Sequence, residues 1–184
     1  MANADNALLF LFSTLFELYL WVLLLRILLQ LVRADFYNPI SQLIWQVTQM
    51  PVRPLQVVLP KVRRFDTAAA VLAWAVALAY VYVACWLLHQ SVGFVAIAWY
   101  ALLKLLVLLL NLYTLSLFVQ AILSWVGPGV SNPAGSILWS MNEPLLRPVR
   151  RVIPPMSGLD LAPLVVILLL QVANRLVPLP GLLR

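Results

Sequence analysis

The chain has 184 residues, of which 64% are apolar and only 10% are charged, and its mean hydropathy is +1.00. Soluble domains are about half apolar and about a quarter charged, so this composition excludes an ordinary soluble domain and indicates a chain embedded in lipid. The net charge of +6 does not predict a nucleic-acid partner, because the basic residues cluster in the connections between apolar segments.

The first apolar segment extends from about residue 8 to residue 32. The residues before it include Asp5 and no Lys or Arg, and no small-residue cleavage site follows it, so it differs from a secretory signal. We interpret it as a retained transmembrane helix.

Three further apolar segments follow, at about residues 67–88, 101–126 and 161–177. Each is long enough to cross a hydrocarbon core of about 30 Å, the last one only just. Backbone groups in lipid must be satisfied within the segment, which makes helix the expected structure. The stretch 95–100, with Trp99 and Tyr100, is expected at the outer interface.

Signature residues recur 94 positions later, without a gap, and each half is therefore predicted to fold in the same way. The predicted repeats are residues 1–94 and 95–184. The recurring residues are Asn38-Pro39 with Asn132-Pro133, Trp45 with Trp139, and Asp66 with Asp160.

Two spans per repeat return the chain to its starting side, which predicts parallel repeats with both long connections on one face. That face holds eight of the twelve basic residues, so the positive-inside rule places it in the cytoplasm and both termini in the periplasm. Seven of the eight are candidate contacts for anionic lipid headgroups or a partner protein: Arg53, Lys61, Arg63, Arg64, Arg147, Arg150 and Arg151.

Each long connection is predicted to begin with an amphipathic helix in the membrane plane, at about 39–50 and 133–144, with Trp45 and Trp139 near the headgroups. Asn38-Pro39 and Asn132-Pro133 supply an N-cap followed by a proline suited to the first helical position. Later prolines are expected to forbid a longer helix and to form stiff basic straps.

The second span is predicted to pack through small residues at four-residue spacing, Ala69, Ala73 and Ala77. Asp66 and Asp160 are expected to cap the second and fourth spans, with a ligand role as the alternative.

Polar residues within the spans are the main candidates for function: Glu17, Asn111, Gln171, Asn174 and Arg175. Counting along the helices places Glu17 and Arg175 at one depth, and we predict an ion pair that locks the first and last spans together. The alternatives are an ion or proton path and no direct contact. Arg26 and Lys104 are expected to snorkel to the interfaces.

No phosphate-binding loop, catalytic triad or metal-ligand spacing is recognisable, so the sequence predicts no catalytic residue, no metal and no cofactor. The lone His89 is interpreted as an interfacial residue, because no other ligand type is near it in sequence.

The doubled Asn-Pro pairs, the doubled Arg-Pro pairs at 53–54 and 147–148, and the segments 16–19 and 35–39 resemble the YggT family of bacterial inner-membrane proteins, called YlmG in Gram-positive bacteria and plastids. The match covers nearly the whole chain. The resemblance implies an integral membrane protein without known catalysis, with links to osmotic-stress tolerance, ion uptake, division or nucleoid placement, and cytochrome assembly.

The sequence thus predicts an all-α membrane protein of four transmembrane helices in two tandem repeats. Its expected function is that of a non-enzymatic scaffold or assembly protein that binds anionic lipid and a membrane-protein partner or a second copy of itself. The alternative is a component of an ion transport or channel complex, motivated by the polar residues within the spans.

Overall fold

The computed structural model describes residues 2–62, 64–126, 133–154 and 160–183, so Arg63 and Asn132 lie outside the described residues. The described chain forms six α-helices and one short 3-10 helix. These are α1 (Ala2–Leu31), α2 (Pro39–Val58), α3 (Thr67–Leu87), α4 (Phe94–Val126), α5 (Pro133–Val152), α6 (Ala162–Leu176) and η1 (Gly181–Leu183).

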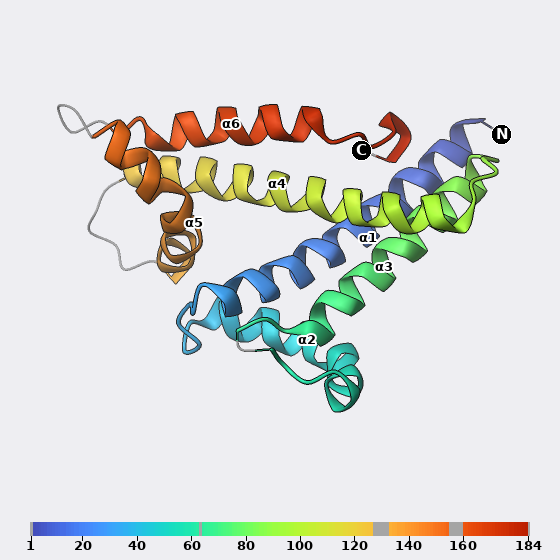
Figure 1. Cartoon of the computed structure of the whole chain (residues 1–184), viewed down its shortest axis with the longest axis horizontal. Helices are drawn as coiled ribbons and strands as arrows, with labels where there is room; N and C mark the ends of the chain where they lie inside the picture. The colour runs from blue at the N-terminus through green and yellow to red at the C-terminus, as the bar shows by residue number, and fades with distance from the viewer. Residues whose placement is uncertain (1, 63, 127–132, 155–159, 184) are drawn as a thin grey trace.

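The helices form two packed pairs, each with a third helix at one end (Figure 1). Helix α1 packs along α3 and α4 along α6, while α2 contacts α1 and α3, and α5 contacts α4 and α6. The pairs converge near the N-terminus, the 88–93 link and η1, and they diverge toward α2 and α5. Helices α2 and α5 therefore lie at the same end of the molecule and contact each other.

The α1–α3 contact is built on small residues. Ala69, Ala73 and Ala77 are at most 1% exposed, and Leu20 and Leu23 of α1 are fully buried. Small side chains allow two helix backbones to approach closely. The predicted packing face of the second span is confirmed.

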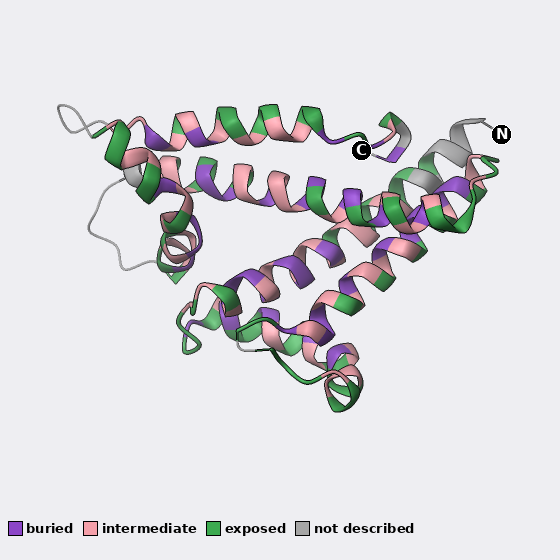
Figure 2. Cartoon of the chain, in the orientation of Figure 1, coloured by how far each residue is buried: buried purple, intermediate pink, exposed green. Residues whose placement is uncertain are grey.

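The outer faces of the helices are exposed along much of their length (Figure 2), and many of the exposed residues are large and apolar. On α6, Leu164, Leu168 and Val172 are each 58% exposed. Apolar surface of this extent is unfavourable in water, and it is the surface expected of helices that face lipid.

Three helices are long and apolar enough to cross a membrane, over Phe10–Leu31, Thr67–Leu87 and Phe94–Leu123. The third of these is one continuous helix from Phe94 onward. The predicted fourth span is a shorter apolar helix of 15 residues, which is about 22 Å long against a core of about 30 Å. The fourth crossing therefore stays a prediction.

The helices α2 and α5 have 20 residues each and continue through Pro51 and Pro54 and through Pro144 and Pro148. The prediction that these prolines end the helices, at about residues 50 and 144, is wrong. An internal proline removes one hydrogen bond and bends a helix, and tertiary packing can sustain the helix beyond it. Both helices change direction along their length (Figure 1), and the later turns are held by side chains with no exposed surface, such as Val52 and Leu146.

The local capping chemistry agrees with the prediction where it is described. The Asn38 side chain accepts from the backbone N–H of Ile40, and the Asp66 side chain accepts from that of Ala69. Asp160 lies one residue before the N-cap of α6, which is Leu161, and its carboxylate accepts from the N–H of Ala162 at 3.0 Å. These short polar side chains satisfy helix N–H groups that have no intrahelical partner.

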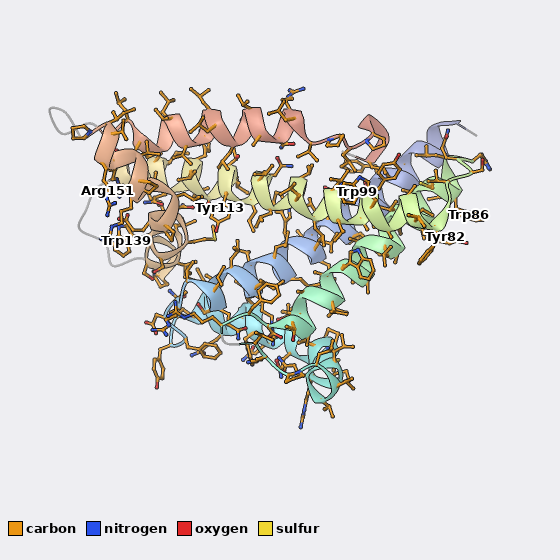
Figure 3. The ribbon with its side chains drawn as sticks, viewed as in Figure 1. Tyr82, Trp86, Trp99, Tyr113, Trp139 and Arg151 are labelled. Carbon is orange, nitrogen blue, oxygen red and sulfur yellow. The ribbon has the colours of Figure 1, made fainter. Side chains whose placement is uncertain are left out.

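Exposed aromatic residues mark the end of the molecule that carries the termini. Tyr82, Trp86 and Trp99 lie there and are 61%, 68% and 56% exposed (Figure 3). Trp139 and Arg151 lie at the opposite end, on α5. Aromatic side chains are typical of membrane–water interfaces, so their position is consistent with helices that cross between the two ends.

Candidate functional site

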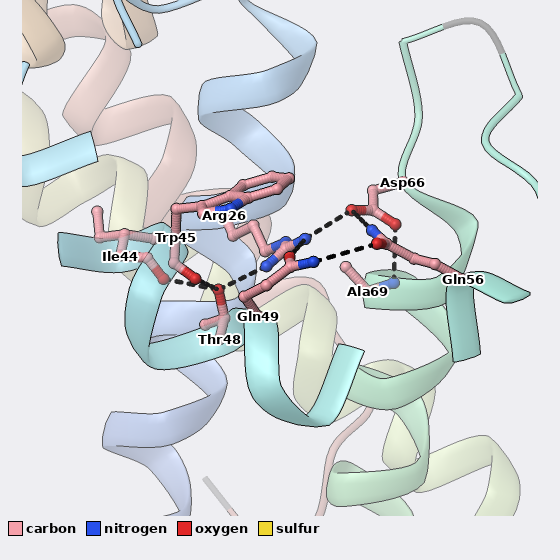
Figure 4. Close-up of polar contacts among 8 residues, drawn as sticks. All are labelled: Arg26, Ile44, Trp45, Thr48, Gln49, Gln56, Asp66 and Ala69. Atoms are coloured by element: carbon pink, nitrogen blue, oxygen red, sulfur yellow. Dashed lines mark hydrogen bonds and ion pairs between the residues drawn. The ribbon is translucent and has the colours of Figure 1, made fainter. Parts of the chain in front are cut away.

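Helix α1 presents Arg26 to α2 and α3, where the residue is 2% exposed. Its guanidinium donates to Thr48 Oγ1 at 2.9 Å, to Gln49 Oε1 at 2.8 Å and to Asp66 Oδ2 at 3.2 Å (Figure 4). Asp66 Oδ2 also accepts from Gln56 Nε2 at 3.1 Å. We call these five residues the Arg26 centre. It joins α1, α2 and the start of α3 through one buried carboxylate.

The Arg26 centre corrects the prediction that Arg26 snorkels to the headgroups. The side chains of Arg26 and Asp66 are 1% and 0% exposed, and a charge buried without its partner costs several kcal/mol. Trp45 covers the guanidinium at 3.9 Å and also lies 5.2 Å from the Lys61 ammonium. Trp139, in contrast, is 57% exposed.

A second polar cluster joins α4, α5 and the start of α6. Asn142 is fully buried and donates to Gln120 Oε1 at 2.7 Å. Arg150 forms ion pairs with Glu143 at 2.7 Å and with Asp160 at 2.8 Å, and these three side chains are 27–28% exposed. We call these five residues the Arg150 centre.

The two centres correspond residue by residue at the offset of 94 positions. The corresponding pairs are Arg26 and Gln120, Thr48 and Asn142, Gln49 and Glu143, Gln56 and Arg150, and Asp66 and Asp160. Arginine and glutamine have exchanged places between the first pair and the fourth. In both centres the aspartate receives an arginine, from α1 in one and from α5 in the other.

Sequence reasoning missed both centres. It identified the two aspartates as helix caps but assigned them no cation. The signal was available, because following the offset of 94 positions from Arg26 and Gln56 reveals the exchange. Ionisable residues deep in the apolar spans stand out in a hydropathy pattern, whereas most members of the centres belong to the connections.

The candidate basic residues on the connections fall into two groups. Arg150 forms ion pairs with Glu143 and Asp160, so its charge is not free to bind a headgroup or a partner. Five of the others are exposed: Arg53, Lys61, Arg64, Arg147 and Arg151.

The predicted pair between Glu17 and Arg175 is wrong. Glu17 pairs with Lys104 of α4 at 2.5 Å, and the Lys104 ammonium also donates to the Leu183 carbonyl at 2.8 Å. Helix α1 contacts α4 directly, so Lys104 is its lateral neighbour, whereas counting along the chain gives depth alone. Lys104 is 1% exposed and lies 4.8 Å from the Tyr80 ring, which also excludes the predicted snorkelling.

The other members of the predicted polar layer gather between α4 and α6. Asn174 Nδ2 donates to Asn111 Oδ1 at 2.5 Å. Asn111, Gln171, Asn174 and Arg175 line one cavity together with Val107. Four of the five predicted residues therefore share a site, and Glu17 lies in a different contact.

The contacts within the two centres hold helices in fixed positions. Their ionic groups are matched with opposite charges, and their amide and hydroxyl groups are hydrogen-bonded, which holds α2 and α5 in defined places. Within the described residues, no group of three His, Cys, Asp or Glu side chains is arranged to hold a metal ion.

Three helices of membrane-spanning length, exposed apolar outer faces and ion pairs enclosed between helices are consistent with a multi-helical membrane protein. Comparison with known families makes the assignment specific. The family model described as CCB3/YggT matches residues 5–87 and 99–180, and the chain belongs to this family.

Named relatives match over nearly their full length. The Escherichia coli K12 protein called "Uncharacterized protein YggT" is 41% identical over 170 residues, which are 92% of this chain and 88% of that protein. A Vibrio alginolyticus protein called "Uncharacterized protein in proC 3'region" is 42% identical over 173 residues, 93% of each chain. A Pseudomonas aeruginosa relative is 36% identical over 179 residues, 96% of this chain and 91% of its own. No solved structure matches the chain.

Proposed function

We propose that this protein is a non-enzymatic membrane scaffold, built from two tandem repeats with four spans, whose helices α2 and α5 form a basic platform on the cytoplasmic face. The two stretches that match the family model begin at residues 5 and 99, which are 94 positions apart. This is the offset at which the two polar centres correspond. Both observations support a duplicated unit.

The observation that carries the proposal is that α2 and α5 are fixed to the spans and to each other. The Arg26 and Arg150 centres attach each helix to its own half. Asn38 Nδ2 then donates to the Pro133 carbonyl at 2.6 Å and to Ser136 Oγ at 3.0 Å, which links the starts of α2 and α5. A rigid surface loses little conformational entropy when a partner binds, which suits a scaffold.

The platform carries exposed cations and exposed apolar side chains together. Leu43, Val47 and Met50 of α2 are 59%, 53% and 86% exposed, and their spacing places them on one side of the helix. The cations are the five exposed residues named above. This combination is suited to a helix at a membrane surface with anionic headgroups. Such a platform would serve the assembly and osmotic-stress roles implied by the family resemblance.

The arrangement of spans is tested by cysteine labelling. In a Cys85→Ser background, single cysteines replace Gln46, Arg147, Gln90 and Gly181, all of which are exposed. Membrane-impermeant thiol reagent applied to inverted vesicles is expected to label positions 46 and 147, and reagent applied to right-side-out cells is expected to label positions 90 and 181. Labelling of 147 and 181 from the same side would show that α6 does not cross and would overturn the four-span arrangement.

The scaffold role is tested by crosslinking in native membranes with a photo-reactive residue at position 46. The triple variant Arg53→Ala, Arg147→Ala, Arg151→Ala is expected to lose the crosslinked protein species. Arg175→Ala, which removes a cation from the α4–α6 cavity instead, is the control and is expected to retain them. The same crosslinks in the triple variant would contradict a basic platform that binds partners.

A second candidate function, as a component of an ion transport complex, is favoured by the cavity between α4 and α6. Its polar lining of Asn111, Gln171, Asn174 and Arg175 lies within apolar helices, where polar groups often mark ion paths. Ion flux in proteoliposomes that is abolished by Asn111→Leu, with the fold retained, would support this function. Absence of flux in the unaltered protein would leave the scaffold.

A further inference from the structure

A pocket of about 150 Å³ lies between the last turns of α1 and the first turns of α2. We call it the α1–α2 pocket. Its polar lining is Arg26, Gln30, Arg33 and Ser41, and its aromatic wall is Phe36 and Trp45. It belongs to the cytoplasmic side in the proposed topology.

The lining contains polar atoms that the protein itself leaves unsatisfied. Within the described chain, four buried side-chain nitrogen or oxygen atoms have no hydrogen-bond partner, and three of them are Arg26 Nε, Gln30 Oε1 and Ser41 Oγ. Arg26 and Ser41 are 2% and 7% exposed. Each such atom costs about 1–3 kcal/mol and is rare in folded proteins. Their concentration in one pocket wall indicates that a ligand completes these hydrogen bonds after small side-chain rotations, with acceptor oxygens for Arg26 Nε and Ser41 Oγ and a hydroxyl group for Gln30 Oε1.

Arg33 follows the end of α1 and brings a second guanidinium to the pocket. Its φ angle is 57°, in the left-handed region, and its side chain is exposed at the pocket. A residue with a Cβ atom is strained there, by about 1 kcal/mol or more, and glycine is the usual choice. The position 94 residues later is Gly127. His89 has the same conformation just past the end of α3, so this backbone geometry belongs to helix ends, and what distinguishes Arg33 is that its guanidinium lies at the pocket.

The charge of the lining selects an anion. Two guanidinium groups line the α1–α2 pocket, and none of its lining residues carries a carboxylate. Asp66 neutralises Arg26 from the opposite side, so the charge of Arg33 remains. Arginine pairs with phosphate oxygens through strong charge-assisted hydrogen bonds. The hydroxyl of Ser41 and the Nε–H of Arg26 add two further donors.

We propose that the α1–α2 pocket binds the phosphate group of a phosphate ester, with Arg33 as its charged contact and Ser41 and Arg26 Nε as further donors. The ester of a membrane phospholipid fits best, because Phe36, Trp45 and the apolar side chains of the wall suit the glycerol and the first acyl carbons. A free phosphate ester offers the same oxygens. This assignment stands whether or not α2 and α5 serve as a scaffold.

The test is calorimetric titration of the purified full chain in a neutral detergent. The ligands are short-chain phosphatidylglycerol, the phosphate-free diacylglycerol of equal chain length, glycerol 3-phosphate and inorganic phosphate. We expect one saturable site for phosphatidylglycerol. Weaker binding of glycerol 3-phosphate and phosphate identifies a lipid as the ligand, and equal binding identifies a free phosphate ester. Both outcomes support a phosphate site, whereas equal binding of the phosphate-free diacylglycerol, or no binding of any phosphate, overturns it.

Variants separate binding from folding. Arg33→Gly is expected to weaken phosphatidylglycerol binding tenfold or more, while the melting temperature stays equal or rises because the backbone strain is relieved. Arg33→Asn, also tolerated in the left-handed region, is a second variant with the same expectation. His89→Gly is the matched control, since His89 has a φ of 53° and lies outside the pocket. This variant should bind phosphatidylglycerol as tightly as the unaltered chain. Unchanged affinity in both Arg33 variants would overturn the proposal.

Discussion

The exchange of arginine and glutamine between the two polar centres predicts a rescue experiment. Arg26→Gln removes the cation from Asp66 and gives the first centre the residue that the second centre has at this place, Gln120. Adding Gln56→Arg then supplies a cation from α2, as Arg150 does from α5. The double variant should therefore be more stable than the single one.

The size of the effect follows from burial. The Arg26 and Asp66 side chains are 1% and 0% exposed, and breaking a buried pair of this kind costs about 3–5 kcal/mol because one charge stays buried alone. The single variant also loses the hydrogen bonds to Thr48 and Gln49 and the contact with Trp45. The second substitution should restore about half or more of the loss, since it replaces the ion pair but not the contact with Trp45.

The assay is equilibrium unfolding in mixed micelles, with the free energy of unfolding compared among the unaltered chain, the single variant and the double variant. Arg151→Gln, an exposed arginine on α5, is the control and should change stability by no more than about 0.5 kcal/mol. A double variant as unstable as Arg26→Gln alone would refute the correspondence between the two centres.

Three further outcomes follow from the contacts, each read by the same unfolding assay. Glu17→Gln should cost more stability than Lys104→Met. The Lys104 side chain is 1% exposed and that of Glu17 is 32% exposed, so the lysine that Glu17→Gln leaves unpaired is the costlier charge. The reverse order would contradict the pairing. Ala73→Leu should cost about 1–3 kcal/mol through overpacking against α1, whereas Val71→Leu, at a position 41% exposed, should cost little. Asn38→Asp keeps the cap acceptor but removes the amide donor to α5. It should lower the free energy of unfolding by about 1 kcal/mol and speed amide hydrogen exchange at the start of α5. Unchanged exchange there would argue against the contact between Asn38 and α5.

The starts of α2, α3 and α5 could be predicted from sequence, whereas the ends of α2 and α5 could not. Helices α2 and α5 begin at Pro39 and Pro133, and α3 begins at Thr67, each where the sequence placed a start. An N-cap and a following proline act within one turn, so the local sequence is sufficient. The ends of α2 and α5 depend on burial of Val52 and Leu146 against other helices, which no local pattern reveals.

The partners of the buried charges could not be predicted, because a single sequence does not show which helices pack side by side. Depth along a helix can be counted, and Glu17 was correctly expected to need a cation. Which helix lies beside α1 at that depth is a matter of lateral packing, and the structure places Lys104 there in place of Arg175. The duplication gave part of the answer, because residues that recur at the offset of 94 positions occupy corresponding places in the two polar centres.

The gathering of both chain ends and the 88–93 link at one end of the molecule (Figure 1) has a consequence for protein engineering. Circular permutation, with a flexible linker joining the old ends and new ends opened within the link, would reverse the order in which the two halves are synthesised and leave every helix beside its present neighbours. The order of membrane insertion would thus become an experimental variable, separate from the final architecture.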